Sequence, residues 1–394
     1  MTIRLAQRLQ RIQPSATVSI TARAGRLREA GRDIIVLSVG EPDFATPEHI
    51  KAAAREALAR NDTKYTAVDG SRALKEAVVT KLARDNGLRY TPEQVLISSG
   101  AKQSCYNACL ALLDPGDEAV VLAPYWVSYP DMVRLADAQP VIVESSAARG
   151  FKIGPEQLKA AMTPRTRLVI LNSPCNPTGA VYTHADWVAL GDVLRRYPDA
   201  VILSDEIYEH IYWAGSPFAS FAASCPDLYE RTITVNGMSK GYAMSGWRLG
   251  YAAGPVPVIK AMTSLQSQST TNASTLSQAA ACAALLGDQQ CVADMRAEFH
   301  RRHDLFYAGI HALPGFDCVP ASGTFYLFPN VERAMRQKSA ATDIELCEQI
   351  LEATGVALVP GTAFGAPGHL RFSFAASTET LTTALTRLRA FMAD

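Results

Sequence analysis

Lys240 is the residue whose surroundings point most clearly to chemistry. It lies within Asn236–Arg248, where small, apolar and uncharged polar residues surround it and Arg248 follows. Apolar neighbours and a nearby cation both lower the pKa of a lysine, and a neutral amine is the form that Schiff-base chemistry requires. Because a single lysine is ordinarily a solvated surface residue, the assignment depends on this neighbourhood.

Three further polar turns each follow a predicted strand. A carboxylate at the end of a buried strand needs a hydrogen bond or a cation as partner. Asp205 is closer to its strand than Glu206 and is therefore the better candidate, although a role as N-cap of the next helix explains Asp205 equally well. Asn176 lies in Asn172–Gly179, where two prolines make a rigid loop that can present its side-chain amide at a fixed position. The alternative is that this loop is only a structural turn. Ser99–Lys102 opens a helix whose N–H groups suit a phosphate, although alone it favours a simple tight turn.

Short apolar runs alternate with helical patterns and must position these turns, which is typical of βαβ units. The predicted strands are Ile34–Val39, Gln94–Ser98, Ala119–Ala123, Pro140–Val143, Leu168–Leu171, Ala200–Leu203, Thr232–Val235 and Leu249–Ala253. Ligands gather outside the carboxyl ends of strands in open α/β sheets, so we expect the polar turns to form one site.

The chain changes character after Pro255, where the pattern is helical to about Leu313. A smaller α+β tail follows, with strands at Phe325–Phe328, near Val356–Val359 and at His369–Phe374, and helices at Thr342–Thr354 and from Thr378. The tail is too small for an obvious independent domain, so we expect it to join the N-terminal segment.

Composition excludes several classes of function. The 394 residues carry 38 Lys and Arg against 38 Asp and Glu, a balance that argues against nucleic acid and anionic membrane as partners. With 48% hydrophobic residues and no long apolar run, we expect a globular cytoplasmic protein. Eight cysteines without a C-x-x-C pair indicate buried thiols rather than disulfides or a metal site, and His300 and His303 are expected on a solvated helix face.

Taken together, the segments resemble the pyridoxal-phosphate aminotransferases of fold type I, and among them the bacterial class I aspartate aminotransferases. The matching stretches run in family order over nearly the whole chain: LSVGEPDF (37–44), TKYT (63–66), LDPGDE (113–118), PYWVSYP (124–130), NSPCNPTG (172–179), SDEIYEH (204–210), SKGYAMSGWRLGY (239–251) and VPGTAFG (359–365). The resemblance implies an α/β fold whose large domain has a mostly parallel seven-stranded sheet between helices, plus a small α+β domain from both terminal segments.

The same resemblance implies pyridoxal 5′-phosphate as cofactor and a role for each candidate residue. Lys240 would bind the cofactor covalently and move the substrate proton, while Asp205 would pair with the ring nitrogen. Tyr208 and Asn176 would donate hydrogen bonds to the ring oxygen, and Trp126 would stack on the ring. The phosphate would be held by Gly100, Ala101, Lys102, Ser239 and Arg248, with Tyr65 from the second subunit of a homodimer.

Substrate recognition is implied in the same way. Arg371, in HLRFSF (369–374), matches the arginine that binds the substrate α-carboxylate, beside Trp126 and Asn176, and Gly40 would let the backbone approach. Animal-type members bind the second carboxylate with a partner arginine, but Gln268–Asn272 here holds none. In the bacterial subgroup a lysine serves instead, which makes Lys102 the candidate, supported by Ser15 or Thr17.

The expected reaction is therefore transfer of the amino group of L-aspartate to 2-oxoglutarate, in two half-reactions and without a metal. An aromatic, prephenate or broad-range aminotransferase is the nearest alternative, and Gln13 disfavours prephenate because members that accept it are basic there. A lyase or synthase on the same fold is a more distant alternative. The expected division is 1–46 as N-terminal arm and part of the small domain, 47–290 as the large cofactor domain, and 291–394 as interdomain helix and small C-terminal domain.

Overall fold

A computed structural model describes residues 3–12 and 16–393, without the side chains of residues 16–18 and 21. Its centre is a seven-stranded sheet in the order β2-β8-β7-β6-β5-β3-β4. The strands are β2 (Val95–Ser98), β3 (Glu118–Ala123), β4 (Gln139–Glu144), β5 (Thr166–Asn172), β6 (Val201–Asp205), β7 (Thr232–Gly237) and β8 (Gly250–Ala253). β8 alone runs opposite to the other six strands, so the predicted mostly parallel sheet is confirmed.

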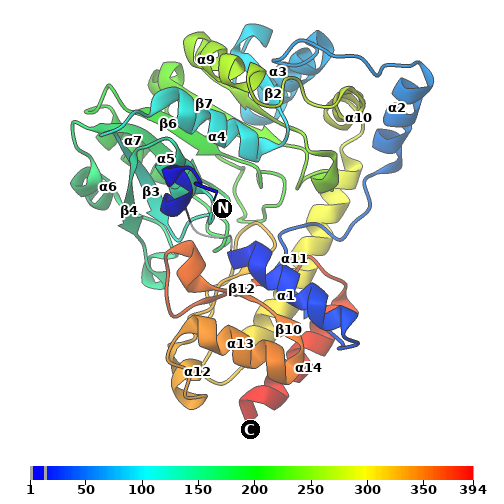
Figure 1. Ribbon diagram of the computed structural model, residues 1–394, viewed down its shortest axis with the longest axis vertical. Helices are drawn as coiled ribbons and strands as arrows, with labels where there is room; N and C mark the ends of the chain where they lie inside the picture. Colours follow the sequence, from blue (N-terminus) through cyan, green and yellow to red (C-terminus); the bar gives the residue numbers. More distant parts are fainter. Residues whose placement is uncertain (1–2, 13–15, 394) are drawn as a thin grey trace.

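Helices cover both faces of this sheet (Figure 1). One face packs against α4 (Ala101–Leu112), α5 (Tyr129–Leu135) and α9 (Val256–Ser267). The other packs against α3 (Arg72–Asn86) and α10 (Thr275–Leu286) near β2, with α2 (Glu48–Ala59) outside them, and against α6 (Pro155–Ala161), α7 (His184–Leu194) and α8 (Phe221–Ser224) near β4. The alternation of strand side chains is visible in β2, where Leu96 belongs to the first core and Val95 and Ile97 to the second.

A smaller layer forms from both ends of the chain, drawn in the lower part of Figure 1. Strand β1 (Ile35–Val36) pairs parallel with β10 (Val356–Ala357), which joins segments more than 300 residues apart. A three-stranded sheet has the order β11-β12-β9. Its strands are β11 (Val359–Pro360), β12 (Leu370–Ser373) and β9 (Tyr326–Leu327), and the helices around both small sheets are α1 (Ala16–Glu29), α12 (Glu332–Gln337), α13 (Asp343–Thr354) and α14 (Thr378–Ala393).

The helical region after Pro255 consists of three helices, α9, α10 and the long α11 (Gln290–His311), which runs from the large sheet to the smaller layer (Figure 1). The expectation of a solvated face at His303 is wrong. The residue is 4% exposed, its Nε2 accepts the Ala321 N–H at 3.1 Å, and its ring stacks on Tyr307. The run of charges around His303 concealed this hydrogen bond with the segment that precedes β9.

The described residues show the state of the cysteines and the character of the helices. All eight cysteines are free thiols, and six of them are buried. Within ranges 3–12 and 16–393, no helix is long and apolar enough to cross a membrane, and no group of three or more metal-ligating side chains was found.

Candidate active site

A cavity of about 260 Å³ opens at the carboxyl ends of the parallel strands. Asn172 ends β5, Asp205 ends β6, and Lys240 follows β7 by three residues. Tyr326 of β9 and Arg371 of β12 close the cavity from the smaller layer. The lining comprises Gly40, Ala101, Lys102, Trp126, Val127, Ser128, Tyr129, Asn172, Asn176, Asp205, Ile207, Tyr208, Ser239, Lys240, Arg248, Tyr326 and Arg371.

The Lys240 amine is the nucleophile candidate of this cavity. Its Nζ donates to the backbone oxygen of Gly40 at 2.5 Å. Burial is the main cause that lowers the pKa of Lys240 to about 8; the nearby charges of Arg248 and Arg371 act in the same direction, and those of Glu41 and Asp205 oppose it. A substantial fraction of this amine is therefore neutral just above physiological pH, as attack on a carbonyl requires.

Asp205 lies at the base of the cavity and is 4% exposed. The hydroxyl of Tyr129 donates to its Oδ2 at 2.6 Å, the thiol of Cys105 lies 3.9 Å from the same oxygen, and the Ile207 N–H donates to Oδ1 at 3.1 Å. All three donors are neutral, and burial raises the pKa of Asp205 despite them. A buried carboxylate with only neutral donors is stabilised by a cationic ligand group.

The Tyr208 hydroxyl shares a 2.9 Å hydrogen bond with the hydroxyl of Tyr326, and burial raises the pKa of Tyr208 well above its ordinary value. Burial also raises the pKa of Tyr326, so both phenols stay protonated, and the hydroxyl that accepts within the pair can donate its own proton to a ligand oxygen. Gly40 lies against the second of them, since a Cβ at this position would be 2.0 Å from the Tyr326 hydroxyl. Glycine is required here for a close approach of the chain.

Arg371 is 2% exposed and forms the cationic wall of the cavity. Its Nη1 donates to Asn176 Oδ1 at 3.0 Å and its Nη2 to the backbone oxygen of Ser38 at 2.6 Å. Its guanidinium lies over the ring of Tyr326, 4.5 Å from the centroid, while Nε is buried with no partner among the described residues. Both partners are neutral, so the charge remains available for a carboxylate.

The opposite end of the cavity is an anion cradle. Helix α4 begins at Ala101, and a Cβ at Gly250 would lie 2.2 Å from the Ala101 nitrogen, so β8 closely flanks the first turn. Gly100 has a φ of 89°, and a Cβ there would lie 2.5 Å from Nη2 of Arg248. Ser239 also lines this end. A helix N-terminus, a hydroxyl and an arginine form a typical phosphate site.

Lys102 lines the cavity and is itself exposed, with its Nζ 4.9 Å from the ring centroid of Trp126. Partial burial and the charge of Arg248 lower the pKa of Lys102. Trp126 itself contacts Tyr129 edge-on at 5.2 Å between centroids. The Trp126 ring thus contacts both a cation and Tyr129, the partner of Asp205.

The cavity brings together most of the residues that the sequence singled out. Gly40, Ala101, Lys102, Trp126, Asn176, Asp205, Tyr208, Ser239, Lys240, Arg248 and Arg371 line it, and Gly100 adjoins it. Tyr65 does not line it and is 90% exposed. Ser15 and the side chain of Thr17 lie outside the described residues.

Sequence reasoning missed Tyr129, Cys105 and Tyr326. Tyr129 is three residues after Trp126 within PYWVSYP, so the motif contained it, but nothing in the motif indicates that its hydroxyl reaches Asp205. Cys105 is part of an apolar helix face, and Tyr326 is one of several aromatic residues in a buried strand. Only the packing of separate elements shows their roles.

Comparison with known proteins identifies relatives over the whole length. The family model described as aminotransferase class I and II matches residues 32–388. An aspartate/prephenate aminotransferase of Nitrosomonas europaea is 46% identical, covering 99% of this chain and 100% of the relative, and an aspartate aminotransferase of Geobacillus stearothermophilus is 47% identical, covering 99% of each.

Solved structures agree with this result. The crystal structure of an aspartate aminotransferase from Rhizobium meliloti superposes with a TM-score of 0.95 at 45% identity, covering 99% of this chain and 98% of that one. The aspartate aminotransferase of Thermus thermophilus with maleate has a TM-score of 0.92 at 45% identity, covering 99% and 100%.

Proposed function

The chain belongs to the class I and II aminotransferase family, and from this premise we propose that it transfers the amino group of L-aspartate to 2-oxoglutarate, yielding oxaloacetate and L-glutamate. The observation that carries the proposal is the pair of cations in one cavity. Arg371 is buried with neutral partners, and the exposed Lys102 lines the same cavity. Two cations suit a substrate with two carboxylates, and the Thermus relative was solved with maleate, a dicarboxylate.

The donor set fits pyridoxal 5′-phosphate, the cofactor that the family implies. The anion cradle at Gly100–Lys102, with Ser239 and Arg248, matches its phosphate, and Asp205 matches a protonated ring nitrogen. The Trp126 ring offers a flat face for stacking. When bound, this cofactor supplies an electron-accepting ring and a carbonyl carbon that takes up the amino group.

Each residue then has a defined task. Lys240, whose lowered pKa makes the neutral amine accessible near physiological pH, would bind the cofactor and afterwards carry the proton taken from the substrate Cα. Asp205 would hold a proton on the ring nitrogen, and Tyr129 keeps the carboxylate oriented. Tyr208 and the amide nitrogen of Asn176 would donate to the ring oxygen, while the Asn176 oxygen is occupied by Arg371. Arg371 fixes the α-carboxylate and so directs Cα–H towards the lysine.

Aromatic, prephenate and broad-range activity use the same residues with another side-chain pocket, and two of the relatives are aspartate/prephenate aminotransferases. Lys102→Ala distinguishes these possibilities. Losing one charged contact with the distal carboxylate should lower kcat/KM for aspartate roughly 10–100-fold, with phenylalanine turnover retained. Lys260→Ala, at an exposed lysine of α9, is the control. An unchanged aspartate rate in Lys102→Ala would contradict the assignment.

We further propose a cytoplasmic homodimer that acts on small amino acids and 2-oxo acids. The free thiols support a reducing compartment, and the exposed Tyr65 supports a partner that covers it. The proposed division is an N-terminal arm and part of the small domain (1–46), a large cofactor domain (47–290), and an interdomain helix with the small C-terminal domain (291–394). The pairing of β1 with β10 supports assigning both ends to one unit.

A further inference from the structure

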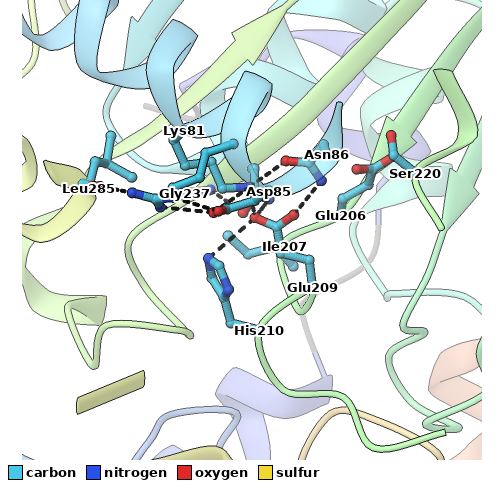
Figure 2. A network of polar contacts seen from close by, with 12 residues as sticks. Lys81, Asp85, Asn86, Glu206, Ile207, Glu209, His210, Ser220, Gly237 and Leu285 are labelled. Carbon is cyan, nitrogen blue, oxygen red and sulfur yellow. Dashed lines mark hydrogen bonds and ion pairs between the residues drawn. The ribbon is translucent and has the colours of Figure 1, made fainter. Parts of the chain in front are cut away.

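A buried carboxylate lies behind the active-site turn and has no part in the chemistry described above. Glu209 is hydrogen-bonded to Lys81, accepts from Asn86 Nδ2 at 2.7 Å and from Asn236 Nδ2 at 2.8 Å, and lies 3.4 Å from His210 Nε2 (Figure 2). Burial alone would raise the pKa of Glu209, but Lys81, with smaller effects of His210 and Asn86, more than offsets this, so the pKa is lowered and the side chain is charged. Helix α3 thus supplies Lys81 and Asn86, and β7 supplies Asn236.

The turn 205–210 directs its polar side chains to two sides. Asp205 and Tyr208 line the cavity. Glu206 and Glu209 do not line it and are anchored elsewhere: Glu206 Oε1 accepts from Ser204, Ser220 and the Phe221 N–H, and Glu209 is anchored as described above. Two buried carboxylates therefore fix the back of the turn whose front presents Asp205 and Tyr208.

The residues around Glu209 also contact the segment that carries Lys240. Asn236, which donates to Glu209, accepts the Gly237 N–H at 2.7 Å through its side-chain oxygen, and Lys240 follows three residues later. The His210 ring rests against the residue after the lysine, since a Cβ at Gly241 would lie 2.8 Å from His210 Cδ2. The turn 205–210 and the segment that carries Lys240 thus meet at Glu209 and His210.

We propose that Glu209 is a positioning residue: through Asn236 and His210 it sets Lys240 in register with Asp205 and Tyr208. The proposal rests on the proposed function, because register matters only if one ligand contacts all three side chains. Stability alone is a weak reason for burying Glu209 and Lys81 together, since well-packed apolar residues often stabilise a core as much as a buried ion pair does. Misplacement by about 1 Å can cost roughly a hundredfold in rate, so a rigid link between the two segments has a direct use.

Asn236→Ala tests the link, because it removes the Asn236 contact and leaves the Lys81–Glu209 pair intact. Thr234→Val is the matched control: Thr234 lies two residues earlier on β7, is fully buried, and loses only a hydrogen bond with Tyr90. Three quantities are compared in both variants: kcat and KM for aspartate, the dissociation constant of pyridoxal phosphate, and the midpoint of the pH-dependent absorbance change of the bound cofactor.

In Asn236→Ala we expect kcat to fall at least about tenfold with KM changed little, cofactor binding to weaken, and the absorbance midpoint to rise, since the donors around the ring lose their alignment. Thr234→Val should lose thermal stability only. If Asn236→Ala does not fold, Asn236→Ser replaces it, because a serine hydroxyl can still accept from Gly237 N–H but is too short to reach Glu209.

Equal behaviour of the two variants in all three quantities would overturn the positioning role. The wild-type enzyme separates this failure from a failure of the proposed function. If wild type transaminates aspartate while the Asn236 variant matches the control, only the positioning role is wrong. If wild type does not transaminate, the proposed function itself is wrong.

Discussion

At the scale of single residues, the cavity holds charges whose burial is unfavourable without a ligand. Lys240 shows this most clearly, because its pKa of about 8 means that the folded protein disfavours the protonated amine. Below pH 8 both the folded and the unfolded chain carry the proton, so the folded state bears the full penalty. Above about pH 10.5 neither carries it, and the penalty vanishes.

Lys240→Met should therefore stabilise the cofactor-free protein at pH 7. The pKa difference corresponds to roughly 3 kcal/mol, reduced by about 1 kcal/mol for the lost hydrogen bond to Gly40, which leaves a gain of about 2 kcal/mol. The gain should shrink as the pH rises from 8 towards 10.5. Urea unfolding of both proteins across this range measures it, with Lys260→Met as control. A gain independent of pH would contradict the assigned burial penalty.

Arg371 leads to a second residue-scale prediction. Arg371→Lys keeps the charge but loses the planar fork that now spans Asn176 and Ser38. We expect a loss of about 3 kcal/mol of transition-state binding, or roughly a hundredfold in kcat/KM, for aspartate and glutamate alike. Arg231→Lys is the control, since Arg231 donates to backbone oxygens of Leu194, Tyr197 and Ala200, away from the cavity. Loss for only one of the two substrates would refute a shared α-carboxylate site.

Candidate residues were predictable where a motif carried them and not where contacts did. Lys240 and Asp205 stood out because charged groups beside buried strands need an explanation. Tyr129 and the Glu209 cluster could not be found in this way, because their meaning depends on atoms of other elements that meet only in the folded chain.

At the scale of elements, the start of α4 is the feature on which cofactor binding most depends. Gly100 combines a positive φ with close contact to Arg248. Gly100→Ala should displace this arginine and raise the dissociation constant of pyridoxal phosphate at least about tenfold, besides costing about 1 kcal/mol in backbone strain. Absorbance titration of the cofactor-free protein measures the constant.

Gly116→Ala is the matched control for Gly100→Ala. Gly116 has a φ of 98° but nothing within 4 Å of the position of a Cβ. The Gly116→Ala variant should lose a similar amount of stability while its cofactor affinity stays unchanged. Equal affinities in the two variants would show that the cradle does not depend on a bare backbone at position 100.

Element positions were predicted well because strands and helices follow local patterns. Every predicted strand of the large sheet overlaps an observed one, for example Thr232–Val235 within β7. Sheet order could not be predicted: β8 pairs with β2 and β7 and alone runs antiparallel, which no local pattern encodes. The helical stretch after Pro255 proved to be three helices, with the first break after Ser267 and the second after Leu286.

At the scale of the whole molecule, the position of Tyr65 predicts that two chains share each active site. Because it is exposed and lies outside the cavity of its own chain, a role in cofactor binding requires a second copy. A hybrid dimer of one Lys240→Ala chain and one Tyr65→Ala chain tests this. If Tyr65 acts across the interface, the hybrid has one intact site and should show about half of wild-type activity. If it acts within its own chain, the hybrid has none, and activity should not exceed that of Tyr65→Ala.

The central claim is that this cavity exchanges the amino group of a dicarboxylic amino acid with its bound cofactor. The most direct measurement is the absorbance spectrum of the cofactor-loaded protein after mixing with a single amino acid and no acceptor. L-aspartate and L-glutamate should convert the cofactor to its amino form, with stoichiometric release of the 2-oxo acid and faster than L-phenylalanine does. An unchanged cofactor accompanied by continuous product formation, or conversion by phenylalanine but not by aspartate, would contradict the account.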